Sequence, residues 1–264
     1  MSILQVIFIG VIGFFLPHFI SLEVVMKYLS SSTPEIMDDA HFMIQLTLFF
    51  VISIASVFFV KIEKNKEKQF NFYSFFVILF GFLSFLLFFN IAYESVCFYF
   101  FNDHFKLLYS ELTTVIPTSD GDVDWVSLGE SILLFCVLVP IFEEVFFRRV
   151  IFQLLILNHG FLLSSVVSSV IFGLYHDVFL IPFLISIALS FIYQKFGLVG
   201  SIATHAIYNL LFLLVHLVYF KIHDYHLTMA SELNTKTVVP MIVSALLLSL
   251  CLVLYRRYPL KQKL

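Results

Sequence analysis

Three short clusters of polar residues interrupt long apolar stretches of this 264-residue chain. The clusters are Glu143-Glu144 with Arg148, Phe172 with His176, and His205 with Asn209. An ionisable group near the centre of a membrane helix costs about 2.5–3.5 kcal/mol on insertion scales, so each cluster needs a reason to be there. A carboxylate and two imidazoles that converge in a cavity of low dielectric can activate water. The residue types therefore indicate a hydrolytic site.

Each of these side chains suits a particular task in amide hydrolysis. Burial and a neighbouring histidine tune a carboxylate for proton transfer near neutral pH, which makes Glu143 the candidate general base. His176 can hold the water or share its proton. His205 and Asn209 can donate hydrogen bonds to the oxyanion of a tetrahedral intermediate. Alternatively, Glu143, His176 and His205 form an acceptable ligand set for zinc, with a water in the open position.

The spacing of the polar residues suits helices. Glu144 and Arg148 are four residues apart, so they can pair on one helix face. Glu143 is turned about 100° away from that face and can point elsewhere. In the same way, four-residue spacing puts Phe172 with His176, and His205 with Asn209, on shared faces.

A predicted turn at 158–160 would bring two of the clusters to one level. Glu143 lies 15 residues before this turn and His176 lies 16 residues after it, so a helical hairpin would place them side by side. That level is about 22 Å from the turn, whereas His205 is about 12 Å beyond a second turn at 197–200. The levels agree if the hairpin tip at 150–162 projects beyond the bilayer or bends along its surface.

Composition indicates an all-α, polytopic membrane protein. The chain is 61% hydrophobic and 12% charged, about half the charged fraction of a soluble domain. A span needs about 20 apolar residues, and we expect eight spans: 3–26, 41–60, 71–101, 128–157, 161–176, 178–196, 198–220 and 238–256. We divide the chain into an N-terminal part (1–127), a core (128–220) and a last part (221–264). The net charge of −3 gives no indication of nucleic-acid binding.

Basic residues predict the orientation of these spans. Lys61, Lys64, Lys66 and Lys68 lie in the 61–69 segment, and the C-terminal tail is also basic, whereas 102–127 is acidic. Because Lys and Arg accumulate on the cytoplasmic side, both termini should be cytoplasmic in a multi-pass cell-membrane protein.

The three clusters together resemble the motifs of the CPBP family, also called the Abi family, of CAAX prenyl proteases and bacteriocin-processing proteins. The family patterns Glu-Glu-x-x-x-Arg, Phe-x-x-x-His and His-x-x-x-Asn read here as Glu143-Glu144-Val-Phe-Phe-Arg148, Phe172-Gly-Leu-Tyr-His176 and His205-Ala-Ile-Tyr-Asn209. The resemblance covers roughly residues 128–220. It implies an intramembrane metalloprotease-like endopeptidase in which Glu143 activates water, with Glu144, Arg148 and Phe172 supporting the site. Other protease designs fit less well, because the chain has no H-E-x-x-H and no G-x-S-x-G.

Other functions compete with peptide hydrolysis. The chain could be a non-catalytic membrane scaffold or regulator of the same family, or a bacteriocin-immunity protein. A transporter that uses the charged cluster as an ion site is a third class, but the sequence offers no internal repeat for it. For a peptidase, the partners are the bilayer and a membrane-associated substrate, which could be a prenylated tail, a bacteriocin leader or a peptide pheromone. The Glu144–Arg148 pair could also be purely structural.

The predicted topology can be tested by labelling single cysteines introduced at positions 65 and 120. In a background without the native cysteines, Asn65→Cys should be accessible from the cytoplasm and Asp120→Cys from outside, because the first lies in a basic segment and the second in an acidic one. A membrane-impermeant maleimide applied to intact cells and to inverted vesicles measures this. Labelling of both positions from the same side would contradict the eight-span prediction.

Overall fold

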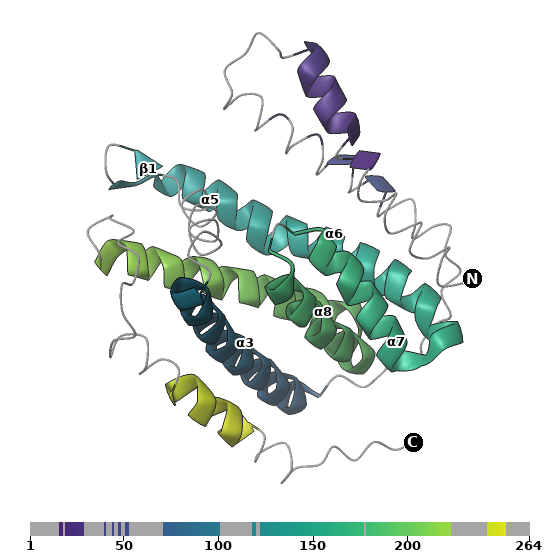
Figure 1. The fold of residues 1–264 in the computed structure, drawn as a ribbon, viewed down its shortest axis with the longest axis vertical. Helices are drawn as coiled ribbons and strands as arrows, with labels where there is room; N and C mark the ends of the chain where they lie inside the picture. Colours follow the sequence, from purple (N-terminus) through teal and green to yellow (C-terminus); the bar gives the residue numbers. More distant parts are fainter. Residues whose placement is uncertain are drawn as a thin grey trace. The chain divides into compact units, whose positions relative to one another are not determined.

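The computed structural model is helical over nearly all of the residues that it describes (Figure 1). These are residues 16–17, 19–28, 40, 44, 47–48, 51–52, 71–100, 118–119, 122–176, 178–222 and 242–251. The predicted spans 3–26 and 41–60 lie largely outside this set, as do the basic 61–69 segment and the C-terminal tail. The prediction of eight spans is therefore confirmed only as far as a helical membrane protein.

A continuous helical segment carries the first polar cluster. It consists of α5 (Trp125–Leu133), η1 (Leu134–Leu138), α6 (Val139–Glu144), η2 (Val145–Phe152) and α7 (Gln153–Leu174). Asp124 caps its start by accepting hydrogen bonds from the backbone N–H groups of Val126 and Ser127. Both η1 and η2 are π-helices, a wide form that is rare and is frequently found at functional sites.

Two glycines bend the long helices at the predicted turns. Gly160 within α7 has φ 73° and ψ 172°, and Gly197 within α8 (Leu180–Ile222) has φ 75° and ψ −170°. Only glycine adopts this backbone conformation without substantial strain, because it has no Cβ. Each glycine therefore divides its helix into two arms, as predicted for 158–160 and for 197–200.

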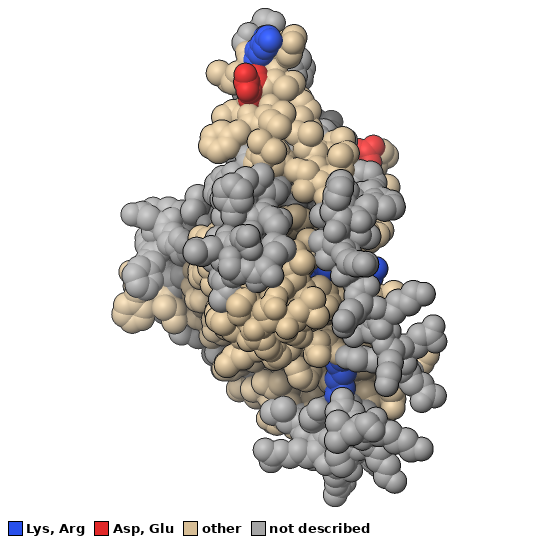
Figure 2. All heavy atoms as spheres, turned by 90° about the vertical axis from the view of Figure 1, so that its right-hand side faces the viewer, with Lys and Arg blue, Asp and Glu red and all other residues tan. Residues whose placement is uncertain are grey.

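Three of the described helices are long and apolar enough to cross a membrane. Their candidate spans are Phe72–Phe89 in α3 (Phe72–Phe100), Trp125–Leu174 and Leu180–Leu214. A shorter apolar helix, Ile242–Cys251, lies in the eighth predicted span. It approaches α3 closely, since a Cβ added at Gly81 would lie 3.2 Å from the Cβ of Cys251. Charged residues are sparse among the described residues on the face in Figure 2, as a lipid-exposed surface requires.

Two boundaries differ from the sequence-based expectation. The helix predicted over 161–176 ends at Leu174, where the N–H groups of Tyr175 and His176 bond to the carbonyls of Phe172 and Gly173, three residues back. Such bonds tighten and end a helix, so His176 stands just beyond it. In addition, Thr118–Ser119 (β1) and Asp122–Val123 (β2) pair antiparallel over two residues each, and the described residues are otherwise almost entirely helical, as the all-α class predicts.

The chain divides into two compact units. The first comprises residues 1–68 and 138–202, and the second comprises 69–137 and 203–264. Within the first unit, η2 runs beside the bend of α8, because the Gln153 amide donates to the Tyr193 hydroxyl at 3.0 Å and Ser201 hydrogen-bonds to Glu144. The Gly197 bend is therefore level with η2, and the tip around Gly160 extends past it.

The turn after α7 requires a glycine at position 173. A Cβ there would lie 2.9 Å from ring carbons of Phe179 and 3.0 Å from its carbonyl oxygen. We expect Gly173→Ala to lower the free energy of unfolding by about 1–3 kcal/mol, the usual cost of overpacking. The melting temperature of detergent-solubilised protein measures this. Gly129→Ala is the control, because nothing lies within 4 Å of its added Cβ and alanine favours a helix by about 1 kcal/mol. Equal melting temperatures for the two variants would contradict the close approach.

Candidate active site

A buried ion pair lies at the centre of the first unit. Arg148 Nε is 3.1 Å from Glu144 Oε2, and both side chains are completely inaccessible to solvent. The predicted pairing of these two residues on one helix face is therefore confirmed. The contact is ionic and not an aligned hydrogen bond. An uncompensated charge at this depth would cost several kcal/mol. Separating the two side chains is therefore unfavourable, and each keeps the other in place.

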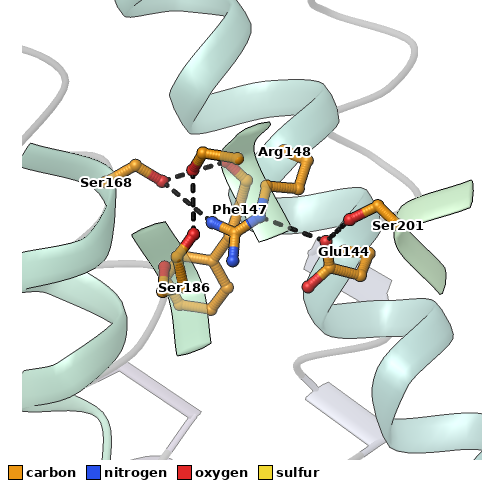
Figure 3. Close-up of polar contacts among 7 residues, drawn as sticks. Glu144, Phe147, Arg148, Ser168, Ser186 and Ser201 are labelled. Atoms are coloured by element: carbon orange, nitrogen blue, oxygen red, sulfur yellow. Dashed lines mark hydrogen bonds and ion pairs between the residues drawn. The ribbon is translucent and has the colours of Figure 1, made fainter. Parts of the chain in front are cut away.

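Hydroxyl groups from two other helical arms complete this pair (Figure 3). Ser201 of α8 donates to Glu144 Oε2, and Arg148 Nη1 donates to the Oγ of Ser168 at 3.4 Å. The Ser168 hydroxyl in turn donates to the carbonyl of Phe147 at 3.3 Å, within the π-helix η2. One ion pair thereby links η2, the second arm of α7 and the second arm of α8.

The Arg148 guanidinium does not use all of its N–H groups in hydrogen bonds to described residues. Among the described residues, no hydrogen-bond partner is present for Arg148 Nη2 or for the buried hydroxyl of Ser186, which Figure 3 places beside the cluster. Buried polar atoms without a protein partner are commonly satisfied by internal water. This part of the protein is therefore polar enough to hold water inside an apolar bundle.

His176 is held in a defined tautomer. Its Nδ1 lies 2.9 Å from the carbonyl oxygen of Phe172. A carbonyl oxygen can only accept, so Nδ1 carries a proton, and in the neutral form of the ring Nε2 is the unprotonated nitrogen. That nitrogen can accept a proton from water or bind a metal, and ligating histidines often donate their other N–H to a carbonyl in this way.

Packing of η2 against α7 places Glu143 and His176 at one level. The rings of Phe147 and Phe172 meet at 4.9 Å and 79°. Glu143 lies one turn before Phe147, and His176 lies one turn after Phe172, so the antiparallel register brings them to the same height, as the hairpin arithmetic predicts. Glu143 is 3% exposed, and its charge acts on the neighbouring Tyr175.

His205 and Asn209 belong to the second unit. His205 is buried, and Asn209 is partly buried. The Asn209 amide donates to the carbonyl oxygen of Phe135 at 2.8 Å, which ties α8 to the π-helix η1. One of its two amide hydrogens is thus engaged with the backbone. The convergence of His205 and Asn209 on Glu143 stays a prediction.

Sequence reasoning missed the serines and the π-helices. Ser168, Ser186 and Ser201 are fully buried, and their only signal in the sequence is a hydroxyl in an apolar helix. A serine can bond to its own helix instead, as Ser190 does to the Ser186 carbonyl at 3.0 Å. The types of residue alone cannot distinguish these two situations.

The predicted zinc site of Glu143, His176 and His205 stays a prediction. Among the described residues, no group of three His, Cys, Asp or Glu side chains lies close enough together to hold a metal ion. Glu143 and His176 belong to the first unit, and His205 belongs to the second.

Comparison with known families addresses the segment that carries all three motifs. Residues 126–211 match a family model. Its description is Type II CAAX prenyl endopeptidase Rce1-like. The match confirms the resemblance to CAAX proteases inferred from the motifs, over about one third of the chain, and supports a membrane protease at the level of the family. No curated protein and no solved structure was found to match the chain.

The ion pair and its hydroxyl partners should differ in their effect on stability. Glu144→Gln leaves Arg148 without its counter-ion and should cost about 3–5 kcal/mol. Ser201→Ala removes one hydrogen bond to a charged group, which should cost about 1.5–3 kcal/mol. Melting of detergent-solubilised protein and its abundance in membranes measure both.

Ser190→Ala is the matched control for Ser201→Ala. Both serines are fully buried in α8, but Ser190 bonds only to its own helix. Its loss should cost less than the loss of Ser201. An equal effect for the two serine variants would show that the Ser201–Glu144 contact adds nothing beyond burial.

Proposed function

We propose that this protein is an intramembrane endopeptidase that hydrolyses a peptide bond in a membrane-associated protein or peptide. The observation that carries the proposal is the buried Glu143 at the level of His176, whose tautomer leaves Nε2 free of a proton. The Rce1-like match over this segment supports the same class of chemistry. Membrane-associated substrates suit a site carried by helices long and apolar enough to span the bilayer.

The proposed reaction begins with a water molecule held between Glu143 and His176. Glu143 takes a proton from the water as its oxygen attacks the carbonyl carbon of the scissile bond. His205 and the second amide hydrogen of Asn209 donate to the oxyanion that forms. When the carbon–nitrogen bond breaks, protonated Glu143 returns its proton to the leaving amine. The products are a new carboxyl terminus and a new amino terminus.

A divalent metal is a proposal of its own. Zinc held by Glu143, His176 and His205 would supply a Lewis acid for the carbonyl oxygen. Incubation with a strong chelator, followed by an assay with and without added zinc, tests this. Unchanged hydrolysis after metal removal assigns the reaction to the side chains alone.

The non-catalytic scaffold is the second candidate. A buried, hydrogen-bonded polar cluster can serve helix packing alone, as the Ser201–Glu144–Arg148–Ser168 contacts do. A scaffold has no use for a second buried carboxylate at the level of a histidine whose Nδ1 is bonded to a carbonyl, which is why we favour hydrolysis.

Glu143→Gln separates these candidates. Glutamine is nearly isosteric with glutamate but cannot accept the proton, so we expect hydrolysis to fall by about 10²–10⁴-fold. Melting temperature should stay close to that of wild type, because the ion pair with Arg148 is made by Glu144. Peptide release is measured by mass spectrometry of membrane and secreted peptides from cells that carry each variant.

Glu144→Gln is the control for the assignment of the base. We expect it to lower abundance while the protein that remains folded keeps partial activity. Near-wild-type hydrolysis by Glu143→Gln would refute Glu143 as the base. A cellular phenotype that survives in Glu143→Gln without any hydrolysis would instead favour the scaffold.

A further inference from the structure

Phe172 is a buried aromatic residue that contacts His176, Phe147 and Arg148. It is 1% exposed. Its ring meets the ring of His176 at 4.6 Å, with 38° between the planes. It also meets Phe147 edge to face, and the Arg148 guanidinium carbon lies 5.6 Å from its centroid. The side chain therefore stands between the ion pair and the histidine.

Two separate groups of Phe172 act on His176. The backbone carbonyl accepts the Nδ1–H, which fixes the tautomer. A single hydrogen bond does not fix the tilt of an imidazole, because the ring can rock about it. The phenyl ring packed against the imidazole limits that motion. Together the two groups define both the protonation site and the direction of Nε2.

The support of Phe172 comes from η2. Phe147 packs against Phe172 and also against Tyr175, at 6.2 Å. Tyr175 meets His176 at 5.3 Å and 77°. His176 is therefore flanked by two aromatic rings that both rest on Phe147, and Phe147 itself is fully buried beside the Glu144–Arg148 pair.

We propose that Phe172 is a positioning residue for His176, and that Phe147 and Arg148 hold Phe172 in place. Phe147 and Phe172 connect the ion pair to the imidazole of His176 through direct ring contacts. These contacts hold the imidazole in one orientation, so that Nε2 points in one direction. The proposal rests on the proposed hydrolytic function, in which Nε2 holds the attacking water. It assigns to the ring of Phe172 a task in catalysis that is separate from core packing.

Phe172→Leu is the first test, with Phe152→Leu as its matched control. Leucine keeps the backbone carbonyl and an apolar side chain but removes the ring. Phe152 is also fully buried in the first unit and has two edge contacts, with Phe161 and Tyr193. We expect Phe172→Leu to lower kcat about 10–100-fold, the effect of a small misplacement of a reacting group. KM should change less than about twofold, and Phe152→Leu should lower the melting temperature comparably while kcat changes less than about twofold.

The second test observes His176 itself. Nitrogen-15 NMR of histidine-labelled protein distinguishes the two neutral tautomers, and a His176→Gln sample assigns the signal among the nine histidines. We expect the Nδ1–H tautomer in wild type, in Phe152→Leu and in Phe172→Leu, because the backbone carbonyl is kept in all three. Only Phe172→Leu should shift and broaden the His176 signal, because its imidazole can rock about the hydrogen bond once the phenyl ring is gone. An equal loss of kcat in both leucine variants, or an unchanged His176 signal in Phe172→Leu, would overturn the proposal. This NMR measurement needs no substrate. It can therefore test the positioning of His176 even if Glu143→Gln proves active and the proposed function fails.

Discussion

The buried ion pair between Glu144 and Arg148 is the constraint on which the rest of the structure depends. Two charges in an apolar bundle must compensate each other and must also find hydrogen-bond partners, because water is scarce there. The partners come from other helical arms, through Ser168 on α7 and Ser201 on α8. The ion pair lies within one helical segment, but its hydrogen bonds reach two other helical arms. These hydrogen bonds fix the arms of the first unit around η2.

The π-helices also have backbone groups that receive hydrogen bonds from polar side chains elsewhere in the chain. A π-turn disturbs the ordinary helical ladder and leaves carbonyl groups that accept other donors. In η2, the Phe147 carbonyl accepts from Ser168, and in η1 the Phe135 carbonyl accepts from Asn209. Each unit therefore has one polar side chain that satisfies a carbonyl of a wide turn. A hydrogen bond requires a particular distance and angle, whereas an apolar contact does not.

Much of this arrangement could be predicted from the residues. Four-residue spacing predicts the Glu144–Arg148 pair, and two glycine-containing turns predict the bends at Gly160 and Gly197. The end of α7 could not be predicted, because it depends on the close approach of Phe179 to Gly173. Ser201 was missed for a similar reason: its partner lies 57 residues away in the chain, and no local pattern distinguishes it from Ser190. Residue spacing in the sequence predicts contacts within one helix. Contacts between helices can be identified only once the fold is known.

The two adjacent glutamates have different tasks because their surroundings differ. Glu144 faces a cation and a hydroxyl donor, so its charge is compensated and it is a poor acceptor of a further proton. Glu143 is also buried, and the ion pair of Arg148 Nε is with Glu144. Placing both carboxylates on one turn lets Glu144 fix the helix through Arg148, while Glu143 stays available for the proposed reaction with His176. Stability and reactivity are thereby assigned to neighbouring residues, and a change in one need not remove the other.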